Sequence, residues 1–287
     1  MRTFLVSAVV ALIGVASGGC ASHAALADKP KPQNVTTGVT IESSDPRLAA
    51  VLLAHRMLPS AESHLAVARE YVRLGILDAA QAQTQQALEL KPRFAAAHEM
   101  MARIWRDWGQ PDAALPHVQR AIYFDAASAS AQNTLGTILD ALGRVDGARA
   151  AFTRAFELDA TAGWALSNLC YLEFRQGRFE QARQYCEAAL RIAPTLAEAH
   201  NNLGLTHAAM GDLTGAKQAF LATGDVAAAY YNLGIVHLSS RRYEAAAEAF
   251  ADAIKARPEF SAAKSRAHEA RMLALGGHQR KSHDDDR

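Results

Sequence analysis

The stretch HNNLGLTHAAMGDLTGAKQAF, residues 200–220, decides the fold of this chain. Leu203 and His207 lie four residues apart, so on a helix they share one face. Ala216 and Phe220 have the same spacing, and they form the matching face of a second helix. A glycine stands between the two runs. The stretch therefore predicts two helices joined by a tight turn.

The turn glycine of this stretch recurs along the chain every 34 residues. Glycine suits the end of a helix because it takes a positive φ without strain. The series consists of Gly75, Gly109, Gly143, Gly177 and Gly211. Two series of small residues keep the same period, namely Ala80, Ala114, Ala148, Ala182 and Ala216, and Ala87, Ala121, Ala155 and Ala189. Three coincident series predict stacked helix pairs, each of which buries its apolar face on its neighbours.

This period and these positions resemble the tetratricopeptide (TPR) repeat family, from Ala61 to about Phe260. The resemblance implies an all-α fold, a right-handed α-α superhelix (TPR solenoid) of about six helix-turn-helix repeats with a capping helix at each end. The expected repeats are 61–94, 95–128, 129–162, 163–196, 197–226 and 227–260. We expect the capping helices at 45–60 and 261–275, and a disordered tail at 276–287, because Gly276-Gly277 ends the last helix.

Three departures from the repeat pattern predict local differences. Pro116 falls inside the second helix of repeat two, where we expect a distortion. In repeat six the Asn-Leu-Gly motif at residues 232–234 follows its predecessor after 30 residues, so the second helix of repeat five has lost about one turn. Arg241 replaces the turn glycine of repeat six. Either the first helix ends differently there, or the arginine takes a costly left-handed conformation.

Residues 1–19 resemble the signal peptide of an exported bacterial lipoprotein. The segment has Arg2 near its start, an apolar run at 4–16 and small residues before Cys20. The resemblance implies that Cys20 is acylated and anchors the chain, with residues 20–44 as a flexible tether. Ala21 after the cysteine favours an outer-membrane position facing the periplasm. An ordinary cleavage site at residues 25–27 is the alternative, and it predicts a soluble periplasmic protein.

The two remaining cysteines lie in repeat four. Cys170 occupies the small first-helix position of Gly204, and Cys186 occupies the second-helix position of Phe220, so the two helices face each other there. An exported compartment permits a disulfide between them. Two buried thiols that pack as small hydrophobic side chains are the alternative, which we prefer at this point.

The chain carries no pattern typical of an enzyme: no nucleotide-binding loop, nucleophile motif or paired catalytic carboxylates. His64, His98 and His200 share the fourth position of their repeats, so a packing role explains them better than a metal site. The net charge is +1, and no basic tract is interleaved with aromatic residues, which argues against nucleic acid as a partner. We expect no cofactor, no metal and no small-molecule substrate.

The TPR resemblance implies a concave groove, lined by the first helix of each repeat, that binds another protein. Its N-terminal half is charged and its C-terminal half aromatic and apolar, and exposed aromatic residues are the expected hot spots. For Tyr171 and Phe174 the alternative is packing against the next repeat. The chaperone-binding Lys/Asn set is not reproduced, since Leu65 and Arg69 occupy two of its places. The expected groove residues are Arg69, Arg73, Arg103, Arg106, Asn133, Trp164, Tyr171, Phe174, Arg175, Asn201 and Tyr231.

Signal, anchor, tether and repeats together resemble the TPR lipoproteins of Tad (Flp-type) pilus assembly and, less specifically, the pilotins of type IV pilus secretins. The resemblance implies an adaptor that holds a secretin, or another pilus or secretion assembly subunit, at the outer membrane. A soluble periplasmic TPR protein-binding module unrelated to pili is the alternative.

Overall fold

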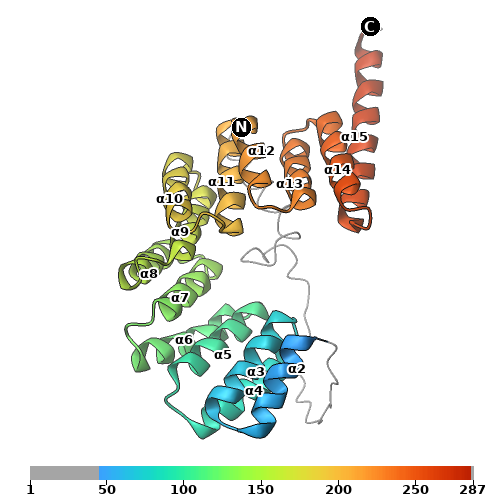
Figure 1. The fold of residues 1–287 in the computed structure, drawn as a ribbon. Coiled ribbons are helices and arrows are strands. Elements are labelled where there is room, and N and C mark those ends of the chain that lie inside the picture. Colours follow the sequence, from blue (N-terminus) through green and yellow to red (C-terminus); the bar gives the residue numbers. More distant parts are fainter. Residues whose placement is uncertain (1–44, 286–287) are drawn as a thin grey trace. The chain divides into compact units, whose positions relative to one another are not determined.

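The computed structural model describes residues 45–285, with side chains described up to residue 275, and this part of the chain contains fourteen α-helices and no strand (Figure 1). The helices are α2 (Pro46–Met57), α3 (Ala61–Arg73), α4 (Leu77–Leu90), α5 (Ala95–Asp107), α6 (Pro111–Phe124), α7 (Ala129–Ala141), α8 (Val145–Leu158), α9 (Gly163–Arg175), α10 (Phe179–Ile192), α11 (Ala197–Met210), α12 (Leu213–Leu221), α13 (Val226–Ser239), α14 (Tyr243–Ala256) and α15 (Ser261–Asp285). Their order confirms the predicted TPR-type α-α architecture.

The turn between the two helices of a repeat forms as the glycine series predicts. From Gly75 to Gly211, the five glycines of the series have φ between 71° and 90°. Arg241 takes the equivalent place in repeat six with φ 57°, so the left-handed alternative holds there. Helix starts are fixed by local caps as well: the Ser60 hydroxyl accepts from the Ser63 amide (3.1 Å), and the Asp45 carboxylate accepts from the Leu48 amide (2.9 Å).

In repeats three, five and six, the two helices meet where a glycine of the first helix faces a phenylalanine of the second. A Cβ on Gly204 would lie 2.4 Å from Cε1 of Phe220, whose ring is fully buried. Gly136 and Gly234 face Phe152 and Phe250 in the same way. The two helices can approach this closely only because glycine has no side chain.

Repeat four replaces this glycine–phenylalanine contact by a covalent bond. Cys170 of α9 and Cys186 of α10 form a disulfide, with their Cα atoms 5.2 Å apart. The preference for two free thiols was wrong, because the helices approach closely enough at this position for the sulfur atoms to bond.

Contacts group the helices into two units, one that ends at Asp159 and one that begins at Ala160. In the N-terminal unit α3 packs on α5 and α5 on α7, and in the C-terminal unit α9 packs on α11. The second helices of successive repeats make no contact of comparable extent in the described part of the chain. Each unit therefore bends toward its first helices. We call the face of α3, α5 and α7, and that of α9, α11 and α13, the inner wall of its unit.

The short repeat five is confirmed, because α12 has 9 residues whereas α10 has 14. Between residues 45 and 285, α11 and α13 lack the extensive packing that joins α9 to α11. Pro116 lies inside α6, which continues through it from Pro111 to Phe124. Proline removes one backbone hydrogen bond, to the carbonyl of Asp112, and Pro116 is exposed, so water can bind that carbonyl instead.

The end of α15 differs from the expectation. The helix continues through Gly276-Gly277 to Asp285, so a helix end at residue 275 with a disordered tail after it was wrong. Glycine costs about 1 kcal/mol relative to alanine within a helix, but it keeps its amide donor, so the hydrogen-bond pattern is not broken.

The signal segment, Cys20 and the tether lie outside the described residues. None of the helices in the described part is both long and apolar enough to cross a bilayer.

Candidate protein-binding site

Two of the predicted arginines are the free cations of the N-terminal inner wall. Arg69 of α3 and Arg103 of α5 occupy equivalent positions of successive repeats. Arg69 is exposed and Arg103 half-buried, and neither forms an ion pair within residues 45–285. Both guanidinium groups are therefore available to a carboxylate from outside the chain.

Arg73, by contrast, is neutralised by the chain itself. Its guanidinium contacts the carboxylates of Asp45 (2.7 Å) and Glu70 (2.6 Å). The hydrogen bond from Arg73 lowers the pKa of Asp45, and the same bond raises the pKa of Arg73. Since Asp45 is the N-cap of α2, the ion pair fastens this helix to α3.

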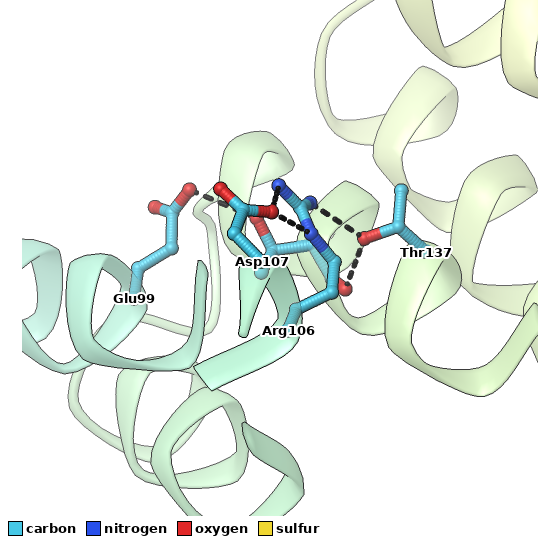
Figure 2. A network of polar contacts seen from close by, with 5 residues as sticks. Glu99, Arg106, Asp107 and Thr137 are labelled. Carbon is cyan, nitrogen blue, oxygen red and sulfur yellow. Dashed lines mark hydrogen bonds and ion pairs between the residues drawn. The ribbon is translucent and has the colours of Figure 1, made fainter. Parts of the chain in front are cut away.

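Arg106 is also occupied, as Figure 2 shows. It donates to Asp107 (2.7 and 2.8 Å) and across to the hydroxyl of Thr137 on α7 (3.0 Å). Beside it, Glu99 of α5 accepts hydrogen bonds from the hydroxyls of Ser130 (2.5 Å) and Thr134 (3.1 Å), both on α7.

These contacts fasten α5 to α7 along the inner wall. Ser130, the partner of Glu99, is not among the predicted groove residues, although it lies at the start of the next repeat's first helix. Asn133 is half-buried on the same helix, α7.

On the C-terminal inner wall, three of the predicted residues are partly exposed, and all three lie on α9. Trp164 lies half-buried in the first turn of α9. The ring of Tyr171 is half-buried, and the guanidinium of Arg175 lies 5.8 Å from its centroid. Tyr171 and Arg175 thus form a cation–π pair that can present one apolar face and one charge.

Two predicted aromatic residues are not at the surface. Phe174 is 1% and Tyr231 2% exposed, so neither can contact a partner without unfolding. Phe174 packs against Phe179, with ring centroids 5.9 Å apart, and Tyr231 packs against Phe250 (5.6 Å) and Phe260 (5.1 Å). Phe174 is thus a core residue, although its ring partner Phe179 lies in the same repeat and not in the next one, as the alternative had it. Phe174 and Tyr231 are therefore not part of the groove surface.

Asparagine side chains link the first helices of the C-terminal unit. Asn202 donates to the carbonyl and hydroxyl of Ser167 on α9, both at 3.1 Å. Asn232 of α13 donates to the predicted groove residue Asn201 (3.1 Å). The side-chain carbonyl of Asn201 is therefore already hydrogen-bonded within the inner wall.

The repeated histidines hold turns between repeats. His98 and His200 donate through Nε2 to the carbonyls of Pro92 (3.0 Å) and Pro194 (2.8 Å), each six residues earlier. His64 instead bonds to Gln83 (2.7 Å). In the described residues, no three His, Cys, Asp or Glu side chains gather as a metal site requires.

Models of one repeat family match this chain over residues 129–161, 161–222 and 201–259, and each is described as a tetratricopeptide repeat. The chain contains TPR repeats. A search of curated proteins finds no match in sequence.

Solved TPR structures share this fold. The APC/C hetero-tetramer Cut9–Hcn1 aligns with a TM-score of 0.64 and 17% identity over 78% of this chain, which spans only 45% of that one. PilW, described as a widely conserved type IV pilus biogenesis factor, aligns at 0.60 and 22% over 71% of this chain and 97% of its own. PilF of Pseudomonas aeruginosa aligns at 0.56 and 17% over 74% and 96%.

At such identities these similarities show the fold alone. Tetratricopeptide repeats generally form scaffolds that bind other proteins, and residues 129–259 of this chain match such repeats.

Proposed function

We propose that the N-terminal inner wall binds an acidic segment of a partner protein. The observation that carries this proposal is the free state of Arg69 and Arg103, one repeat apart in the same register, beside Arg73 and Arg106, which are neutralised within the chain. A carboxylate from a partner would give these two guanidinium groups the negative counter-charge that no residue of the wall provides.

The register also restricts the form of the partner. Two cations on successive first helices fit two carboxylates of one extended segment that crosses α3 and α5. Guanidinium groups recognise carboxylates through two parallel hydrogen bonds, which gives orientation as well as affinity.

We further propose that this protein is an outer-membrane lipoprotein, anchored through Cys20, that acts in the assembly of a pilus or secretion system. The lipoprotein-like segment at residues 1–20 and the fold shared with the pilus biogenesis factor PilW support this role. In this role a secretin or another assembly subunit is the partner. The cleavage site at residues 25–27 supports the alternative of a soluble periplasmic module, and Cys20→Ala separates the two by cell fractionation.

The test begins with cross-linking in the native cells and identification of the partner that co-purifies. Calorimetry then compares its affinity for the wild type and for Arg69→Ala with Arg103→Ala. Because hydrogen bonds to charged groups contribute about 1.5–3 kcal/mol each, we expect at least a roughly tenfold loss.

The matched control removes two exposed arginines elsewhere in the same unit, Arg93→Ala with Arg120→Ala, and should leave the affinity unchanged. Equal affinities for the wild type and the Arg69/Arg103 variant would show that the inner-wall proposal is wrong. A partner that belongs to no pilus or secretion system would refute the assembly role. It would not affect the proposal that the inner wall binds an acidic segment.

A further inference from the structure

The helix that precedes the repeats, α2, is apolar on both of its faces. Its inner face covers repeat one, where Leu48 is completely buried. On its outer face Leu53 and Met57 are 63% and 79% exposed, and Leu58, which follows the last helical residue, is 74% exposed. Ala50, Leu53, Ala54 and Met57 stand at helical spacing on one face, and with the adjoining Leu58 they form one stripe, which we call the α2 stripe.

The charges around the α2 stripe have one sign. Arg47 and Arg56 are exposed, and neither forms an ion pair in the described part of the chain. Residues 46–61 contain no Asp or Glu. The nearest carboxylate, Asp45, caps α2 and is paired with Arg73. The outer side of α2 thus combines an apolar stripe with uncompensated positive charge.

The place of α2 in the chain adds a second argument. Residues 21–44, which are 24 residues, separate Cys20 from the start of the described structure. Even fully extended, such a segment spans no more than about 90 Å. Any acyl chain on Cys20 would therefore hold α2 close to the bilayer and raise its effective concentration there.

From these observations we propose that the α2 stripe lies on the surface of an anionic phospholipid bilayer, with Arg47 and Arg56 against the head groups. An interfacial helix has this combination of an apolar face and basic flanks. A second copy of the chain fits less well, because two α2 helices face to face would bring four arginines together without a carboxylate. The proposal does not depend on what the inner wall binds.

The experiment places a tryptophan in the α2 stripe of the full chain, as Met57→Trp, and adds vesicles of phosphatidylethanolamine and phosphatidylglycerol. Lipids brominated on their acyl chains quench only tryptophan that enters the membrane. We expect the emission added by this residue to fall at least about twofold in brominated vesicles. Leu90→Trp is the matched control, since Leu90 is 61% exposed on α4, and its emission should not change.

A second comparison tests the charges. Arg47→Glu with Arg56→Glu should abolish the quenching at residue 57, and Arg93→Glu with Arg120→Glu should leave it unchanged. Equal quenching at residues 57 and 90 would overturn the proposal, as would quenching that ignores the charge of α2. A wild-type oligomer that dissociates on Leu53→Ser with Met57→Ser, without vesicles, would identify a second copy as the occupant and equally overturn it.

Discussion

Gly204 occupies a place where the second helix of the repeat leaves no room for a methyl group. The ring of Phe220 lies against the glycine and is fully buried, so it has no space into which to turn. The same pair recurs as Gly136 with Phe152 and is replaced by a disulfide in repeat four. This one position thus sets the distance between the paired helices in repeats three to six.

We predict that Gly204→Ala destabilises the protein, although alanine is the better helix former. The strain of inserting a methyl group into a packed core costs about 1–3 kcal/mol, against about 1 kcal/mol gained in helix propensity. Urea unfolding measures the difference. Adding Phe220→Leu should recover part of the loss, and an unchanged free energy of unfolding in Gly204→Ala would contradict the role of this contact.

Arg241 holds a backbone conformation that costs an ordinary residue about 1–2 kcal/mol. Its φ is 57° and its side chain is exposed, so Arg241→Gly removes strain without loss of packing. We predict that this variant raises the free energy of unfolding by about 1 kcal/mol. The neighbouring Arg242 has φ −92°, and Arg242→Gly should instead be neutral or destabilising in the same urea titration.

At the scale of elements, the disulfide joins α9 to α10 across 16 residues of sequence. A cross-link that closes a loop of this size stabilises a protein by about 3 kcal/mol, mainly by restricting the unfolded chain. We predict that a reductant lowers the free energy of unfolding by about this amount. Cys170→Ala with Cys186→Ala should unfold identically with and without reductant, and a wild type indifferent to reductant would show that the bond is not formed in solution.

The helices α5 and α6 enclose a pair of histidines. The rings of His98 and His117 lie 6.4 Å apart, and His98 is buried. Burial, with a smaller contribution from the charges of His98 and Arg120, lowers the pKa of His117 below its ordinary value of 6.5. The folded protein therefore resists a proton that the unfolded chain accepts.

The contribution of His117 to the free energy of unfolding is therefore complete above the ordinary pKa, and it is lost as the pH falls below that value. We predict a lower free energy of unfolding at about pH 5.5 than at about pH 7.5, where carboxylates do not yet titrate. His117→Gln should reduce this difference, since Gln83 occupies the equivalent place in repeat one. A pH dependence identical in the two proteins would exclude this histidine as its source.

At the scale of the whole molecule, the main contacts in the described residues join each helix to the next one or two helices along the chain, as in other solenoids. Damage to one repeat should therefore remain local. We predict that Gly204→Ala raises amide hydrogen exchange in α11, α12 and α13 while α3 and α5 keep their protection, as measured by mass spectrometry. Equal loss of protection in both regions would indicate a single cooperative unit.

Much of this fold was predictable because its signals are local and periodic. The glycine at every 34th residue, the truncated helix of repeat five and the left-handed option at Arg241 depend on helix geometry alone. The helical segment beyond Gly276 was not predictable from the same rules, since glycine weakens a helix without breaking it.

The binding wall was likewise predictable only in part. The sequence by itself determined the repeat period, the turn glycines and which helices could form the wall, since these depend on residues close in the chain. Only the tertiary structure decided that Tyr231 is buried, that Arg73 and Arg106 are neutralised while Arg69 and Arg103 stay free, and that Cys170 and Cys186 bond. Burial and pairing depend on side-chain positions relative to neighbouring helices, and repeat spacing alone does not determine those positions.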